Sequence, residues 1–175
     1  MKYNINDATA ILARSPVVLR DMLTGLDEPW IKNNYGKDTF SPFDVLGHLV
    51  HGEKEDWIGR AKIILTHGES RSFDDFDRYA MYEDSKEKTI DDLLDEFVSL
   101  RKANLVELEG LNISEDQLLL KGKHPQLGTV TLSQLLATWV AHDLHHIAQI
   151  CKCMAYQYKE EVGPWLEYIG IIPKA

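Results

Sequence analysis

Two histidines, His142 and His146, stand four residues apart in the segment that we predict to be the last long helix. Because an α-helix turns about 100° per residue, side chains at this spacing lie one turn apart on the same face. Both histidines fall on one edge of the apolar stripe of this helix. Two imidazoles on an interior edge can bind one divalent cation, by the same spacing that zincin proteases use. The pair therefore predicts half of a metal site.

The residues between the two histidines leave a second interpretation open. The run His142-Asp143-Leu144-His145-His146 lacks the glutamate that follows the first histidine of zincins, so a protease of that class is not indicated. His145 points away from the interior edge, toward solvent or the periphery of a site. The alternative is a pair of core histidines that hydrogen-bond to the backbone or to each other. Two facing imidazoles are costly to desolvate without a partner. The metal interpretation is therefore stronger for this pair than it would be for a single buried histidine.

Two polar neighbours of the pair also have two interpretations each. Gln149 continues the histidine edge and could hydrogen-bond a metal ligand or a metal-bound water; of the two interpretations we favour ordinary polar filler. Asp143 lies near the centre of the apolar stripe, where a carboxylate needs a partner. It either orients an imidazole N–H or forms a buried pair with an arginine of another helix, and we favour the arginine.

A third metal ligand is expected from the second long helix. Periodicity places Glu53 on the apolar face of that helix and places His48 and His51 off it. Periodicity alone therefore predicts Glu53 as the third ligand and His48 as a surface residue. If His48 is buried instead, Gly52 and Gly59 would permit the close helix contact that burial requires. Glu53 would then be a group beside the ligands or a catalytic residue.

Helical spacing of apolar residues predicts four long helices with little strand signal. Ser41 followed by Pro42, Thr89, and either Thr131 or Ser133 are predicted N-caps. We expect one domain over residues 1–175, an all-α four-helix bundle whose short C-terminal tail packs on the bundle. The expected helices span about 16–25 (with a short lead-in from 6), 41–66, 89–109 and 131–158. The expected connections are a loop at 26–40, an acidic irregular segment at 68–88, too polar for the core, and a long connection at 110–130.

Composition excludes several classes of function. The chain carries 28 acidic and 19 basic side chains, a formal net charge of −9. Such a surface repels phosphate backbones and anionic lipid, so neither nucleic acid nor a membrane is an expected partner. No apolar run reaches the roughly 18–20 residues that span a bilayer. Cys151 and Cys153 lie on different sides of one helix and are expected as free thiols, so we predict a cytoplasmic protein.

The arrangement of these motifs resembles the DinB/YfiT-like family of metal-dependent enzymes. The matching pieces are residues 41–49, SPFDVLGHL, and residues 142–150, HDLHHIAQI, with further likeness at 97–101 and 118–132. In that family one histidine of the second helix and two of the last helix bind the metal. The resemblance therefore implies His48, His142 and His146 as ligands, and it disagrees with the helical wheel over His48. It also implies an up-down-down-up bundle with a crossover.

The resemblance implies a class of reaction but no single substrate. Several family members are thiol-dependent S-transferases, with bacillithiol, mycothiol or glutathione as cosubstrate, or related hydrolases, and many have no assigned reaction. A small-molecule substrate, a zinc or nickel ion and a homodimer are therefore expected, while three imidazoles also accept iron. Glu53 and Gln149 are the candidate catalytic residues. The alternatives are a non-catalytic stress-related bundle that metal stabilises and a metal-free protein that binds a small ligand.

Overall fold

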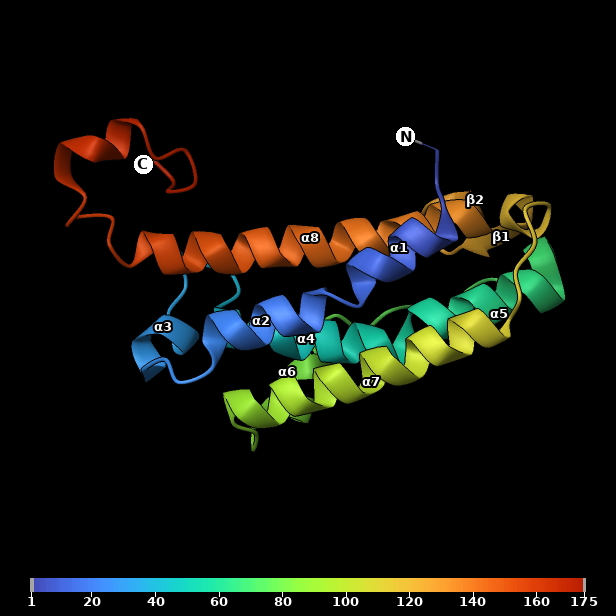
Figure 1. Cartoon of the computed structure of the whole chain (residues 1–175), viewed down its shortest axis with the longest axis horizontal. Helices are drawn as coiled ribbons and strands as arrows, with labels where there is room; N and C mark the ends of the chain where they lie inside the picture. Colours follow the sequence, from blue (N-terminus) through green and yellow to red (C-terminus); the bar gives the residue numbers. More distant parts are fainter. Residues whose placement is uncertain (1, 175) are drawn as a thin grey trace.

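The chain forms a four-helix bundle in which two of the four units are broken into a pair of helices (Figure 1). The structure is a computed structural model and describes residues 2–174. The first unit is α1 with α2, the second is α4 with α5, and α7 and α8 are the third and fourth. The elements are α1 (Ile5–Leu12), α2 (Ser15–Leu23), α3 (Glu28–Lys32), α4 (Pro42–Glu55), α5 (Trp57–His67), η1 (Gly68–Ser70), α6 (Ala80–Ser85), α7 (Ile90–Gly110), η2 (Gln117–Leu119), β1 (Lys121–His124), β2 (Gly128–Thr131), α8 (Leu132–Tyr156) and η3 (Gly163–Glu167).

Two units run in each direction along the bundle. In Figure 1, α1–α2 and α8 run from right to left, whereas α4–α5 and α7 run from left to right. The second and third units are therefore parallel, and the segment between α5 and α7 crosses back along the bundle. This up-down-down-up order confirms the fold that the resemblance implied. No helix among residues 2–174 is both long enough and apolar enough to cross a membrane.

The long helices begin at the capping residues that the sequence predicted. Ser41, Thr89 and Thr131 each accept a hydrogen bond from the backbone N–H three residues on, and the side chain at that position bonds back to the cap. Such caps satisfy N–H groups that have no partner within the helix, and each contributes about 0.5–2 kcal/mol. Of the two candidates for the last helix, Thr131 is the cap. The second helix, expected to be continuous, is interrupted for one residue at Asp56.

The acidic segment at 68–88 contains a helix and contributes to the core, contrary to our expectation. Within it, α6 packs against α4, and Met81 is only 1% exposed. The close contact depends on Gly47, because a Cβ there would lie 2.7 Å from Ser85 Oγ. Nothing lies within 4 Å of the corresponding position at Gly59. The glycine that permits close packing is therefore not one of the two that we expected.

A β-hairpin interrupts the connection between α7 and α8, which was expected to lack strands. Strands β1 and β2 are antiparallel, with Lys121 opposite Thr131. Gly122 lies against Ile64 of α5, where a Cβ would come within 2.5 Å of the isoleucine side chain. Phe73, 3% exposed, donates its backbone N–H to the carbonyl of Lys123. The hairpin and the residues after α5 thus close one end of the bundle.

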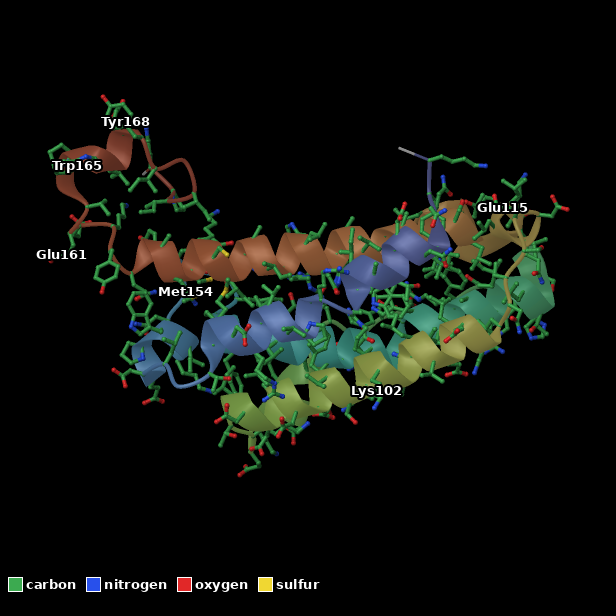
Figure 2. All side chains as sticks on the ribbon, in the orientation of Figure 1. Lys102, Glu115, Met154, Glu161, Trp165 and Tyr168 are labelled. Carbon is green, nitrogen blue, oxygen red and sulfur yellow. The ribbon has the colours of Figure 1, made fainter. Side chains whose placement is uncertain are left out.

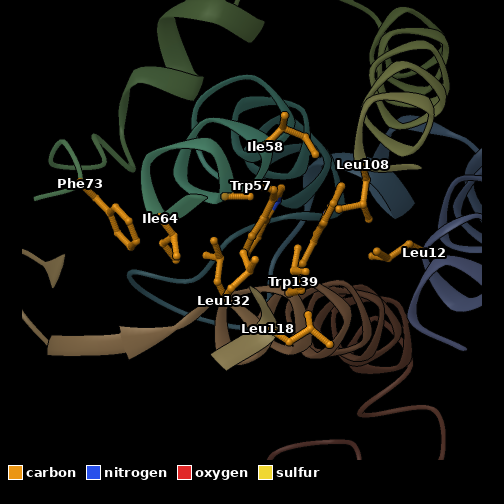
Figure 3. Close-up of a cluster of buried hydrophobic side chains, with 12 residues drawn as sticks. Leu12, Trp57, Ile58, Ile64, Phe73, Leu108, Leu118, Leu132 and Trp139 are labelled. Carbon is orange, nitrogen blue, oxygen red and sulfur yellow. The ribbon is translucent and has the colours of Figure 1, made fainter. Parts of the chain in front are cut away.

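The buried apolar side chains form two clusters, one toward each end of the bundle. The cluster near the hairpin centres on Trp57 and Trp139, whose rings stack at 5.7 Å (Figure 3). The second cluster joins α2, α3, the first half of α4 and the first half of α7, with Ile150 from α8. Between the clusters each of α4, α7 and α8 contributes a buried charged residue: Glu53, Arg101 and Asp143.

The C-terminal tail, residues 157–174, folds back beside the second half of α8 (Figure 2). Ile172 is 2% exposed, so the end of the tail packs against the bundle as expected. Trp165 and Tyr168 point away from the bundle and are 69% and 86% exposed. At the start of the tail, Tyr158 packs against Trp30 at 5.2 Å between ring centres, so the tail contacts the rest of the chain at both of its ends.

Candidate metal centre

Three imidazoles meet where α4 passes α8. The Nε2 atom of His142 lies 3.1 Å from Nε2 of His48 and 3.1 Å from Nε2 of His146. The three ligand atoms all lie within 4.8 Å of one another. Among residues 2–174 this is the one group of three or more His, Cys, Asp or Glu side chains with this geometry. The structure thus brings together the three residues that the resemblance implied.

Burial keeps these imidazoles neutral. It is the largest cause that lowers the pKa of His48 to about 4 and the pKa of His142 to about 2, and the neighbouring His146 adds to both shifts. Burial also lowers the pKa of His146, although its hydrogen bond with Gln149 opposes the shift. A neutral imidazole has one nitrogen lone pair available to a metal. All three side chains are therefore in the protonation state that metal binding requires.

The arrangement of the three Nε2 atoms is more compatible with a shared cation than with hydrogen bonds among the imidazoles. Zinc binds imidazole nitrogen at about 2.0–2.1 Å, which places neighbouring ligand nitrogens about 3.3 Å apart at the tetrahedral angle. Two of the three separations are 3.1 Å, close to this value, and the third is within 4.8 Å. When the proton of a neutral imidazole is on Nδ1, as the contact with Gln149 favours for His146, Nε2 is a hydrogen-bond acceptor. Nε2 acceptors that face one another have no donor between them, whereas a cation accepts all of their lone pairs. The donor set and its spacing thus fit a divalent metal.

Gln149 contacts the His146 ring at Nδ1, on the side away from the Nε2 atom that faces the other histidines. Its Oε1 atom lies 2.8 Å from His146 Nδ1. When Nδ1 carries the proton, Gln149 accepts this hydrogen bond and the Nε2 lone pair points at the other two histidines. Partners of this kind fix the tautomer and the orientation of metal-binding histidines. The contact supports a positioning role for Gln149.

The helical wheel misplaced His48 because α4 is buried on nearly every side. This helix contacts α3, α6, α7 and α8, and its residues from 42 to 53 are buried with the one exception of Asp44. His48 is 8% exposed, and His51 is equally buried, with Nδ1 3.7 Å from the Asp84 carboxylate. A helical wheel assumes one apolar face, so it cannot predict which polar side chains are buried in a helix that packs against four neighbours.

Glu53 lies in a separate ionic cluster and makes no hydrogen bond to the histidines. Its Oε1 atom accepts hydrogen bonds from Arg101 Nη2 at 2.8 Å and from Trp139 Nε1 at 2.9 Å. Its Oε2 atom accepts from Arg101 Nε at 3.1 Å and from Asn104 at 3.0 Å. The Glu53 side chain is 1% exposed. Both carboxylate oxygens are thus engaged, and this arrangement supports a structural role for Glu53 rather than a catalytic one.

Asp143 pairs with an arginine of another helix, the interpretation that we favoured. Arg101 Nη1 lies 2.6 Å from Asp143 Oδ2, and Arg101 Nη2 lies 3.0 Å from Oδ1. Arg101 Nη1 also donates to the carbonyl of Leu12 at 2.7 Å. With its two bonds to Glu53, all five N–H groups of Arg101 have acceptors. The guanidinium therefore joins one residue from each of the four units of the bundle.

Aromatic rings from three segments surround the histidines. Phe76, from the segment before α6, lies 5.7 Å from the His48 ring, and Phe40 lies 6.0 Å from it. Trp57 lies 5.1 Å from the His142 ring. An apolar wall limits water around a polar site and strengthens interactions inside it. Sequence reasoning missed the two phenylalanines because they lie in segments interpreted as loops.

A buried three-histidine cluster in an up-down-down-up bundle is compatible with a divalent metal centre. The sequence matches the family model of the DinB superfamily over residues 11–150, and the chain belongs to this superfamily. Among solved structures it is similar to YfiT from Bacillus subtilis, with a TM-score of 0.72 and 22% identity over 90% of this chain and 87% of that one. YfiT is described as a probable metal-dependent hydrolase with an unusual four-helix bundle topology. No curated protein matches the chain.

Proposed function

We propose that the chain is a metal-dependent hydrolase of small molecules with one divalent ion bound by His48, His142 and His146. The observation that carries the proposal is the convergence of three neutral Nε2 atoms, two pairs of them 3.1 Å apart, at a buried point. The description of YfiT as a probable metal-dependent hydrolase supports the reaction class.

The donor set accepts several metals. Three imidazoles suit zinc and nickel, which we propose first, and iron. Three protein ligands leave a coordination position open, as in catalytic rather than structural zinc sites. When bound, such an ion supplies a Lewis acid that polarises a substrate carbonyl or activates a water or thiol. The chain's own contribution is to hold the three imidazoles neutral, to orient His146 through Gln149 and to surround the site with apolar rings.

Metal binding tests the site directly. We expect the purified full-length chain, freed of metal, to bind one equivalent of zinc or nickel in a calorimetric titration. His142→Ala should weaken this binding by about 100-fold or more, because loss of a direct ligand costs more than loss of the outer partners, which typically costs about 10- to 100-fold. His67→Ala is the matched control, since His67 is exposed at the end of α5 and far in sequence from the cluster. Equal zinc affinity in wild type and His142→Ala, both folded by circular dichroism, would contradict the proposal.

Activity separates the hydrolase from the thiol-dependent transferase that the resemblance also implies. Small activated esters and amides should be hydrolysed by the metal-loaded chain without added thiol, and chelation should abolish the rate. A rate that requires glutathione or bacillithiol, with loss of the free thiol, would instead identify a transferase. Metal that raises the melting temperature without turnover in either assay would favour the non-catalytic bundle.

A further inference from the structure

A cavity of about 400 Å³ lies between α8 and the C-terminal tail. Figure 1 shows the tail folding back over this part of α8. The cavity has the size of a site for a small molecule. Its side-chain lining comes from the loop before α4, from one face of α8 and from the tail; the principal residues are Tyr35, His145, Gln149, Lys152, Ile171 and Pro173.

The lining contains no acidic residue, although the chain has 28 of them. Another polar cavity of similar size, about 360 Å³ beside α5, differs in this respect. It is lined by residues of both signs, among them Asp56 and Arg60, which form an ion pair at 2.7 Å. The charges of that cavity are therefore compensated within the protein. In the tail cavity, by contrast, no acidic side chain compensates the positive charge of the lining.

Lys152 supplies the positive charge of the tail cavity. Its ammonium nitrogen lies 4.2 Å from the centre of the Tyr35 ring, and the side chain is partly buried. Within residues 2–174 no carboxylate lies within ion-pair distance of it, whereas Lys54, Lys62 and Lys88 each pair with a glutamate. A partly buried ammonium with only a ring for a partner is favourably placed to bind an anion.

Gln149 presents a hydrogen-bond donor to the same cavity. Its amide oxygen is engaged by His146 Nδ1 at 2.8 Å. Its amide nitrogen forms no hydrogen bond within the described part of the chain. The group that Gln149 has left to offer is therefore an N–H donor, which a ligand must meet with an acceptor.

We propose that this cavity binds the carboxylate of a small organic anion. The carboxylate lies between the Lys152 ammonium and the Gln149 amide, and the apolar part of the ligand packs against Ile171 and Pro173 of the tail. Because Gln149 bonds Nδ1 of His146, this site lies on the side of the His146 ring away from the Nε2 atom that faces the other two histidines. The anion site is therefore separate from the proposed metal centre, and none of the three histidines lines it.

Succinate is a suitable probe, and succinamide is its uncharged counterpart. In nitrogen-15 NMR spectra of the full-length, metal-free chain, succinate should shift the side-chain amide signals of Gln149, and succinamide should not. Lys152→Gln should weaken succinate binding by about tenfold or more, because it removes a charge-assisted hydrogen bond. Lys159→Gln is the matched control: the Lys159 ammonium also lies over a tyrosine ring, 5.3 Å from the centre of Tyr156, but outside this cavity.

Two results would overturn the proposal. One is the absence of any succinate-dependent shift at Gln149; the other is a succinate affinity of Lys152→Gln equal to that of Lys159→Gln. Because the titration uses metal-free protein, its outcome is independent of the zinc titration described above. Failure of the anion site and failure of the metal site are therefore distinguishable.

Discussion

Two buried polar clusters lie side by side in the middle of this bundle, and they differ in how completely their atoms are partnered. In the cluster of Arg101, Glu53 and Asp143, every guanidinium N–H has an acceptor and every carboxylate oxygen has a donor. In the histidine cluster three nitrogens face one point, and the buried Nδ1 atoms of His48 and His142 have no partner. Both clusters take residues from α4 and α8, and the arginine cluster adds Arg101 from α7.

This difference in hydrogen bonding suggests a structural role for the arginine cluster and a binding role for the histidine cluster. Burial of polar groups is tolerated when hydrogen bonds replace those lost to water, so the arginine cluster is complete as it stands. In the histidine cluster three Nε2 atoms face one point, and the proposed divalent cation would accept their lone pairs there. The convergence of three imidazole nitrogens, rather than a missing hydrogen bond at any single atom, is thus the feature that distinguishes the proposed binding site from the structural ion cluster.

The largest effect that we expect comes from breaking the complete cluster. Arg101→Met leaves Glu53 and Asp143 as buried carboxylates without a counterion. Removal of one partner of a buried ion pair typically costs about 3–5 kcal/mol. We therefore expect a loss of that size in the free energy of unfolding, measured by urea denaturation.

The control for this variant is an arginine whose ion pair is exposed. Arg20 bonds Asp95 at 2.6 Å, and the two side chains are 36% and 75% exposed. Arg20→Met should cost less than about 1 kcal/mol, because solvent screens the pair. Similar losses in the two arginine variants would contradict the distinct role of the buried cluster.

The second expectation is that metal bound by the histidine cluster stabilises the folded chain. Zinc at 100 times its dissociation constant should stabilise the folded chain by about 2.7 kcal/mol, since it binds the native state alone. His48→Ala should remove this gain. The measurement is the urea midpoint with and without zinc. A stabilisation that survives in His48→Ala would mean that zinc binds elsewhere.

Local sequence signals predicted the helices well and the contacts between them less well. Ser41, Thr89 and Thr131 cap helices through hydrogen bonds within three residues, so their roles can be read from the sequence. The burial of His48 depends on helices packed against α4 from four directions, which periodicity cannot describe. The packing of α6 depends on Gly47, and no local signal marks that glycine among the others.

The two polar clusters show the same limit. The position of Asp143 on an apolar stripe predicted an arginine partner, but only the fold identifies Arg101. Periodicity placed Glu53 on the buried face correctly and suggested a ligand, because burial alone does not distinguish a metal site from an ion pair. The resemblance to a family, and not the helical wheel, identified His48 as the third candidate metal ligand.

A smaller effect is expected from the contact that orients His146. Gln149→Ala removes the acceptor 2.8 Å from His146 Nδ1 and leaves the three imidazoles in place. Loss of such partners typically weakens metal binding by about 10- to 100-fold. Calorimetric titration with zinc measures the change, and Gln157→Ala, at a glutamine beyond the end of α8, is the control. Unchanged affinity would mean that Gln149 is polar filler.

The smallest effect is expected from replacing a histidine when no metal is present. His142→Leu keeps much of the side-chain volume and removes two nitrogens, one of which has no partner. Exchange of poorly satisfied polar groups for apolar ones is close to neutral. In chelator-treated protein the free energy of unfolding should therefore stay within about 1 kcal/mol of wild type. A loss as large as that of Arg101→Met would instead show that the imidazoles stabilise the core through their mutual hydrogen bonds. That result would favour the pair of core histidines over the metal centre, because a cluster that is complete without an ion has no need of one.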